Sequence, residues 1–309
     1  MKRIVHVYKG PGQWHRSPPG IGDFVRGTCH LFERLQGTGA DLRVDISQTE
    51  FARLIRQDPA FFQASAPEKI TAAAECFVDA DRVQDRIADF LRSPDEEFFL
   101  STNLGAWDRA KLEAPTREFA KAFYRFTPEV EERTAEFVKG EYAALSIRCG
   151  DKFYGKEGEH TDTGLNRRVF ELIEKEVLSG LRGRPLVVMS DCYPLKRELV
   201  RRYGLITSPY ASQHGAFGNV LPVAVDLNVL KNSRCNYHIN AWQSWWSGFS
   251  HYTSLVFGIP SVNFRMPDFV REEVTPGGTL RIPASVRARQ QLRRLRSFLR
   301  TKILGRTSG

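Results

Sequence analysis

Short apolar, β-rich runs alternate along the chain with longer segments whose apolar positions recur three or four residues apart. Such runs are typical of buried strands, and the longer spacing is typical of helices that cover a sheet. Seven strands are predicted, over residues 4–8, 42–46, 98–102, 142–147, 185–190, 236–240 and 261–264. Helices are predicted over residues 24–35, 49–57, 67–91, 113–139, 165–178, 194–203, 222–233 and 245–257.

Strands that alternate with helices predict an α/β fold with parallel sheets and helices on both faces. The alternation runs twice, once on each side of residue 140, and 309 residues suffice for two cores. We therefore expect two facing Rossmann-like domains with a cleft between them. The expected division is an N-terminal domain at 1–140, a C-terminal domain at 141–270 and a tail at 281–309.

The net charge of +9 belongs to that tail. Of the 45 Lys and Arg, nine lie from residue 281 onward with no Asp or Glu among them, so the other 36 match the 36 acidic residues. A neutral body argues against a nucleic-acid partner. Apolar residues at three- and four-residue spacing among the tail's arginines predict an amphipathic helix on an anionic membrane surface. The alternative is a tail that folds back onto the domains.

No apolar run approaches the roughly 20 residues that span a bilayer, and the N-terminus turns polar too soon for a signal peptide. We therefore expect a cytoplasmic, peripherally membrane-associated protein. The five cysteines are scattered and form no Cys-x-x-Cys pair, which predicts reduced structural thiols and no zinc site.

Ligands of parallel sheets bind beyond the carboxyl ends of the strands, so polar residues directly after a strand are the first candidates. Arg148 ends the strand at 142–147 and is followed by a glycine and Asp151. A guanidinium placed there suits a diphosphate, because its fork pairs two oxygens at once. The alternative is an Arg148 to Asp151 salt bridge that shapes the loop.

Three further places carry candidate chemistry. Asn240 opens a polar loop that leads to Ser244 and Trp245 before a helix, whose free N–H groups favour an anion. Trp245 has packing as its alternative role. Asp226, on the preceding helix, either orients a ligand hydroxyl or faces water. Gly22 belongs to a Gly-Ile-Gly-Asp turn, a weak signal on its own.

Together these places resemble a known family. Ile-Arg-x-Gly-Asp after a strand, Asp-Leu-x-x-Leu-x-x-Ser on a helix, and Asn-x-x-x-Ser-Trp-Trp before a helix resemble the donor-binding half of the α-1,2-fucosyltransferases and their α-1,6- and protein O-fucosyltransferase relatives. The resemblance covers roughly residues 140 to 264. It implies the GT-B architecture, GDP-fucose as donor, inversion at the anomeric carbon, and neither metal nor cofactor.

The family's His-x-Arg-Arg-x-Asp pattern falls on residues 146–151, with Ser146 and Cys149 in place of its His and second Arg. The resemblance implies that Arg148 grips the diphosphate. Asp226 falls on the family's helix aspartate, Asn240 and Ser244 on its loop, and Trp245 on the aromatic pair that follows. The expected donor-binding residues are Gly22, Arg148, Asp151, Asp226, Asn240, Ser244 and Trp245.

The expected function is transfer of a sugar from a GDP-sugar to a hydroxyl of a glycan or lipid-linked glycan. Fucose is the expected sugar. Arg148 would neutralise the leaving diphosphate, and Asp23 or an acid near Asp151 would take the acceptor proton. Two alternatives stay open: transfer of a different nucleotide sugar on the same scaffold, and an inactive relative that binds nucleotide or glycan without turnover.

Overall fold

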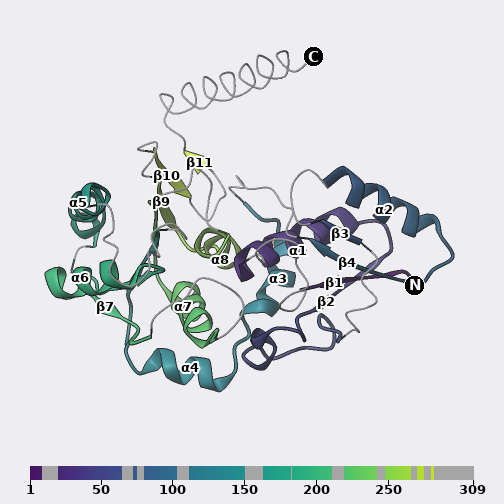
Figure 1. The fold of residues 1–309 in the computed structure, drawn as a ribbon, viewed down its shortest axis with the longest axis horizontal. Helices are drawn as coiled ribbons and strands as arrows, with labels where there is room; N and C mark the ends of the chain where they lie inside the picture. Colours follow the sequence, from purple (N-terminus) through teal and green to yellow (C-terminus); the bar gives the residue numbers. More distant parts are fainter. Residues whose placement is uncertain are drawn as a thin grey trace, which may run out of the picture.

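The computed structural model describes residues 1–8, 20–64, 72–74, 80–102, 111–149, 163–181, 183–210, 219–241, 248–265, 270–274 and 280–281. Two β-sheets lie side by side, and helices fill the space between them (Figure 1).

The N-terminal sheet is parallel, with the strand order β2-β1-β4-β3. Its strands are β1 (Arg3–Val7), β2 (Asp41–Asp45), β3 (Ala72–Ala74) and β4 (Glu97–Thr102). Ile4 and Leu100 pack in one cluster with Phe24 of α1 (Ile21–Leu35), whereas Val5 and Val7 pack apart from that cluster. Side chains alternate between the faces of a strand, so both faces of β1 are buried. Helix α2 (Ala80–Arg92) precedes β4.

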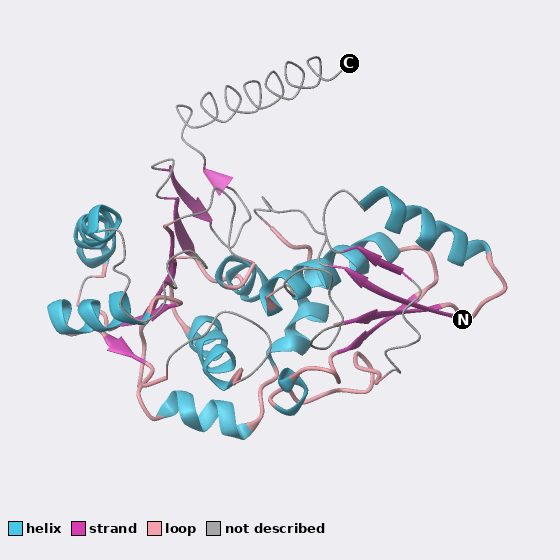
Figure 2. Ribbon diagram, viewed as in Figure 1, coloured by secondary structure: helices cyan, strands magenta, loops and turns pink. Residues whose placement is uncertain are grey.

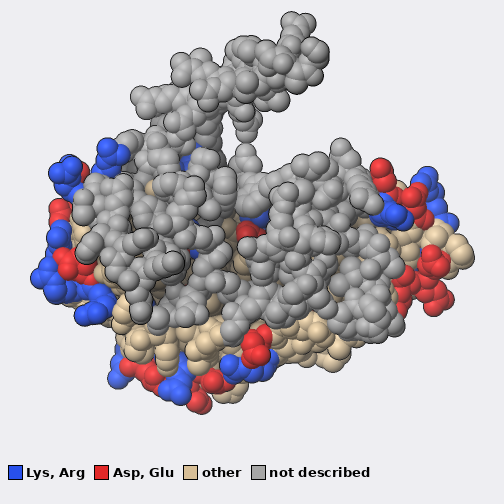
Figure 3. Space-filling model, in the orientation of Figure 1, with Lys and Arg blue, Asp and Glu red and all other residues tan. Residues whose placement is uncertain are grey.

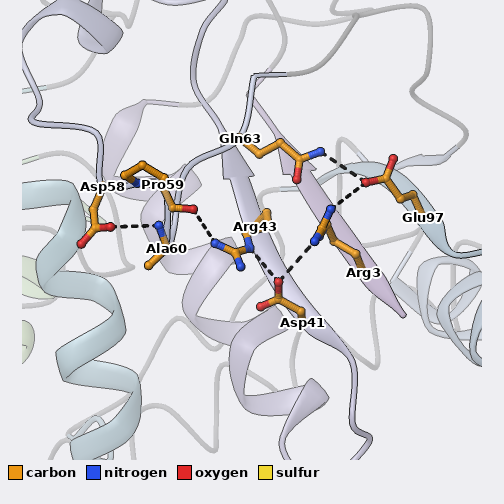
Figure 4. Close-up of polar contacts among 8 residues, drawn as sticks. All are labelled: Arg3, Asp41, Arg43, Asp58, Pro59, Ala60, Gln63 and Glu97. Carbon is orange, nitrogen blue, oxygen red and sulfur yellow. Dashed lines mark hydrogen bonds and ion pairs between the residues drawn. The ribbon is translucent and has the colours of Figure 1, made fainter. Parts of the chain in front are cut away.

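The amino end of this sheet carries a polar network that ties neighbouring strands together (Figure 4). Arg3 of β1 pairs with Glu97 of β4 at 3.1 Å and lies 3.7 Å from Asp41 of β2. Arg43 donates to the same Asp41 carboxylate at 2.6 Å. Because ligands of parallel sheets bind at the carboxyl ends of the strands, we assign this network a structural role.

The second sheet has seven strands in the order β11-β10-β9-β8-β5-β6-β7. The parallel strands are β5 (Ala143–Arg148), β6 (Leu186–Ser190), β7 (Ile206–Thr207), β8 (Asn236–Asn240) and β9 (Ser261–Arg265). Strands β10 (Val270–Val274) and β11 (Leu280–Arg281) add an antiparallel edge. The sheet therefore continues to Arg281, beyond the boundary at 270 that the sequence pattern suggested.

Helices cover both faces of the second sheet. Helix α5 (Thr163–Leu172), which continues through a π-helical turn (Ile173–Val177) and a 3-10 turn (Leu178–Gly180), and helix α6 (Tyr193–Tyr203) lie on one face. There Leu145 and Ile147 pack with Leu195. Helices α7 (Leu221–Asn232) and α8 (Ser250–Phe257) lie on the other face, where Ala144 packs with Val229.

The two halves share one continuous apolar core. Helices α1, α3 (Ala114–Ala120), α7 and α8 lie between the sheets (Figure 2), and each contributes to the same buried cluster, through Phe24, Phe119, Val225 and Leu255 respectively. Helix α4 (Pro128–Ala135) lies against α7, where the Asn228 amide donates to the Thr134 hydroxyl at 2.8 Å. The halves are therefore packed together through buried contacts.

All seven predicted strands are confirmed, and the predicted helices are partly wrong. The helix expected over 49–57 is a short 3-10 turn, Glu50–Arg53. The helix expected over 67–91 contains the strand β3 and begins only at Ala80. The helix expected over 113–139 is divided into α3, a 3-10 turn (Lys121–Tyr124) and α4. Pro128 accounts for that break, because the residue before a proline is disfavoured in helical backbone.

Charged side chains of both signs are interspersed on the described parts of the visible face (Figure 3). No helix in the described ranges is long and apolar enough to cross a membrane. The basic tail from residue 282 onward, with its predicted amphipathic helix, lies outside the described residues.

Candidate functional site

The carboxyl edge of the second sheet carries a row of polar side chains. Arg148 is the last residue of β5, and its partner across the strand pair is Asn240 of β8. Asn240 in turn pairs with Arg265 of β9. Partnered residues of parallel neighbours point to the same face, so two of the expected donor-binding residues, Arg148 and Asn240, lie together.

Asp191 holds the end of β5 in place. Its carboxylate accepts a hydrogen bond from Arg148 Nη1 at 2.6 Å and another from the Cys149 backbone N–H at 2.7 Å. The Arg148 side chain keeps 22% of its surface exposed, against 10% for Asp191. The guanidinium is therefore oriented by a partly buried carboxylate and still reachable by a ligand. The sequence suggested Asp151 as its salt-bridge partner, and Asp151 lies outside the described residues.

Two cysteines lie beside this ion pair. Cys149 and Cys192 are both buried, and Cys192 is the N-cap residue directly before α6. A hydrogen bond from Cys149, assisted by the Leu195 backbone N–H, lowers the pKa of Cys192 below its usual range. The same hydrogen bond, together with burial, raises the pKa of Cys149. Both thiols are free, and together with Ser190 they line the turns after β5 and β6.

The Gly-Ile-Gly-Asp turn lies where the two halves meet. Gly22 is buried in the first turn of α1, and a Cβ built on it would lie 2.3 Å from the carbonyl carbon of Gly248, just before α8. Asp23 pairs with the buried Arg26 at 3.0 Å and is 33% exposed. Gly22 and Asp23, in the first turn of α1, therefore stand at the junction, opposite the segment around Gly248 that precedes α8.

Asp226 is only 4% exposed, so the alternative that it faces water is wrong. Its charge acts on Lys196 of α6, whose ammonium group donates to the Tyr210 carbonyl at 2.6 Å. Burial lowers the pKa of Lys196, and the Asp226 carboxylate opposes that shift. Asp226 on α7 and Lys196 on α6 are thus both buried, and the Asp226 charge acts on Lys196.

Three expected donor-binding residues, Asp151, Ser244 and Trp245, lie outside the described residues. Within the described ranges, no group of three or more His, Cys, Asp or Glu side chains is placed to hold a metal ion.

Sequence reasoning missed several polar residues of this region. Asp191 directly follows the predicted strand at 185–190, so the rule that selected Arg148 could have selected it as well. His238 and Asn263 had no such signal, because they lie inside the strands β8 and β9 and the rule applies only to residues at strand ends. Their roles depend on which strands become neighbours.

The sequence matches no family model and no curated protein. Solved structures do match. A mutant of Arabidopsis thaliana FUT1 in complex with GDP superimposes with a TM-score of 0.55 at 12% identity, covering 85% of this chain and 70% of that one. The α-1,6-fucosyltransferase NodZ soaked with GDP-fucose gives 0.51 at 12% identity, covering 85% and 94%. Fucosyltransferase NodZ from Bradyrhizobium gives 0.51 at 12% identity, covering 85% and 95%.

At such low identity the likeness establishes the fold. The chain has two Rossmann-like halves, as the sequence pattern predicted, in the GT-B arrangement that the resemblance implied.

Proposed function

We propose that the chain is an inverting glycosyltransferase that moves a sugar from a GDP-sugar to a hydroxyl of a glycan acceptor. Fucose is the sugar that we propose. The observation that carries the proposal is Arg148, held by Asp191 at the carboxyl edge of the second sheet and still partly exposed. It is supported by the shared fold, since the similar FUT1 structure contains GDP and a NodZ structure was soaked with GDP-fucose.

In the proposed reaction the acceptor oxygen bonds to the anomeric carbon while the bond from that carbon to the diphosphate oxygen breaks. The leaving GDP takes the electron pair, and Arg148 stabilises the charge that develops on its phosphate. Asn240 lies beside Arg148 and completes the polar row. Attack from the face opposite the leaving group inverts the anomeric centre.

We propose that the second half binds the donor and the first half the acceptor. Asp23, at the start of α1, would take the proton of the acceptor hydroxyl. Its position at the junction and its 33% exposure support this role, because a base must reach both the acceptor and solvent. Gly22 would let the two halves approach each other at the same place.

A purified preparation tests the proposal directly. GDP is expected to raise the melting temperature more than UDP, CDP or ADP at equal concentration, because only a nucleotide that binds the folded state stabilises it. GDP-fucose is expected to be hydrolysed slowly in the absence of an acceptor, and this turnover is expected to survive EDTA. Mass-spectrometric detection of released fucose provides the readout.

The alternatives give different results in the same experiment. Equal protection by all four nucleotides contradicts guanine selectivity and favours another nucleotide sugar. GDP binding without hydrolysis or transfer identifies an inactive binding relative. Turnover that is lost in EDTA and restored by Mg²⁺ or Mn²⁺ contradicts the proposed mechanism, since it assigns the diphosphate charge to protein groups.

We further propose that the basic tail holds the enzyme at an anionic membrane beside a lipid-linked glycan. The support is its sequence, with nine Lys or Arg and no Asp or Glu from residue 281 onward. Each basic residue near such a surface contributes about 1 kcal/mol, so several together suffice for reversible binding.

Truncation after Arg281 tests the role of the tail. The truncated chain is expected to lose binding to vesicles containing phosphatidylserine at low salt, while transfer to a short soluble acceptor stays unchanged. Neutral phosphatidylcholine vesicles serve as the control surface. Loss of the cooperative melting transition on truncation would show instead that the tail belongs to the core.

A further inference from the structure

The face of the second sheet that turns toward α8 is polar where the opposite face is apolar. Ser146 of β5, His238 of β8 and Asn263 of β9 are partners across adjacent strands and form one row. The row of Arg148 and Asn240 lies two residues further along the same strands. Polar side chains therefore continue from the sheet edge inward, beneath Arg148.

A small pocket lies over this row, at the start of α8. Its lining includes the polar residues Ser146, Arg148, His238, Asn240, Ser250 and Asn263, together with two apolar neighbours on β8 and β9. Ser146 and Arg148 are partly exposed, whereas the other four are buried. The pocket thus extends from solvent beside Arg148 to a buried floor. Ser250 comes two residues after Gly248, so the pocket also lies close to the junction of the two halves.

Asn263 lies at the buried end of the pocket with its hydrogen-bonding capacity unused. Its exposure is 0%, and neither the amide nitrogen nor the amide oxygen has a hydrogen-bond partner among the described residues. Leaving a buried donor or acceptor unsatisfied costs about 1–3 kcal/mol. Such a group in a pocket indicates a ligand or water that completes its hydrogen bonds.

His238 adds an acceptor to the same pocket. The Ser254 hydroxyl donates to the Ser250 carbonyl at 3.2 Å, so it accepts from His238 Nε2 at 3.1 Å. Nδ1 is then left as the acceptor, and it has no hydrogen-bond partner among the residues that the structure describes. Burial lowers the pKa of His238 well below its usual range, so the ring stays neutral at physiological pH.

These groups define the chemistry of the ligand. The amide of Asn263 offers donors and an acceptor, His238 offers an acceptor, and the Ser146 hydroxyl offers both. No carboxylate takes part in the described lining, and the cation Arg148 is at its exposed end. A neutral group that both donates and accepts, such as an alcohol hydroxyl, matches this set. A phosphate oxygen does not, because it cannot donate to His238.

We propose that this pocket binds one hydroxyl of the donor sugar, with Asn263 as a specificity-determining residue. The inference rests on the proposed function, which places the diphosphate at Arg148 and hence the attached sugar next to the pocket. The proposal gives strand β9 a part in recognising the sugar, although the site predicted from the sequence contains no residue of that strand. The competing occupant is an ordered water that satisfies Asn263 without contact to the sugar.

Binding constants for GDP and GDP-fucose in the wild type, Asn263→Leu and Ser261→Ala test the proposal. Leucine has nearly the volume of asparagine and removes its donor and acceptor. Ser261→Ala is the matched control: Ser261 is a buried residue of the same strand and face, and its hydroxyl also has no partner among the described residues. Asn263→Leu is expected to weaken GDP-fucose binding about tenfold or more and to leave GDP binding within about twofold. Ser261→Ala is expected to bind both as the wild type does.

Several outcomes would overturn the sugar subsite. Equal loss of GDP and GDP-fucose affinity in Asn263→Leu would place the pocket under the nucleotide, and unchanged affinity for both would make it a water site. GDP-fucose analogues that each lack one sugar hydroxyl provide a second test on the wild type, independent of the variant's folding. At least one analogue is expected to bind about tenfold more weakly, and equal binding of all of them refutes the subsite. A wild type that binds neither GDP nor GDP-fucose refutes the proposed function itself.

Discussion

Replacement of Arg148 by lysine is expected to reduce turnover of GDP-fucose nearly as much as replacement by alanine, by a factor on the order of 10² or more. The guanidinium presents parallel N–H donors in a fixed plane, and an ammonium group cannot reproduce that two-pronged contact with a diphosphate. Lysine keeps the positive charge opposite Asp191 and thereby limits the effect on folding. Steady-state hydrolysis of GDP-fucose by both variants gives the measurement.

Arg201→Lys provides the control for the Arg148 variants. Arg201 lies on the exposed side of α6, where it pairs with Glu198 at 2.6 Å. Exposed pairs of this kind contribute little to stability, so its replacement is expected to leave both kinetics and melting unchanged. Near-normal turnover by a folded Arg148→Ala variant, with folding checked by circular dichroism, would remove Arg148 from the mechanism.

The sheets could be predicted from the sequence because buried parallel strands appear as short continuous apolar runs. The alanines of β3 gave the opposite signal, since alanine is the strongest helix former. Their pairing with β4 overrides that preference, and such a long-range contact has no local signature. The short edge strands β7 and β11 have two residues each, too few for any pattern.

The candidate site was predictable only as far as single strands allow. Arg148 and Asn240 were selected because each stands at the end of a predicted strand. The contact of Arg148 with Asp191 joins residues 43 apart in the sequence, and it depends on β5 and β6 being neighbours. Predicting a role for Asn263 would also require the strand order β9-β8-β5, because that order brings Asn263 into one row with His238 and Ser146.

The turn around Gly22 shows how one pattern supports two roles. Two close glycines before a helix are typical of a turn that approaches a phosphate. In the structure Gly22 closely approaches the backbone of the other half of the chain. The residue that it meets there, Gly248, is also a glycine. A Cβ on Gly248 would lie 2.5 Å from the Asp23 carboxylate oxygen. The pair of glycines therefore sets how closely α1 and α8 can meet.

Replacement of Gly22 by alanine is expected to lower the free energy of unfolding by about 3 kcal/mol, the upper part of the range for overpacked sites. The added Cβ would lie 2.3 Å from the Gly248 carbonyl carbon and the Phe249 nitrogen, and 2.4 Å from the Gly248 oxygen. All three are backbone atoms, so no side-chain rotation relieves the overlap. Relief requires α1 to move away from α8, which disturbs the shared core around Phe24 and Leu255.

Gly20→Ala is the matched control, because Gly20 lies two residues earlier, has a φ of −64° and would place its Cβ with nothing within 4 Å. Its stability is expected to stay within about 0.5 kcal/mol of the wild type. Urea unfolding of both variants, followed by circular dichroism, compares them directly. Equal stability of the two would show that the halves do not meet at Gly22 in solution. If GDP affinity in a still-folded Gly22→Ala is unchanged, Gly22 acts by joining the halves; a loss of affinity without a loss of stability would instead place it in the donor site.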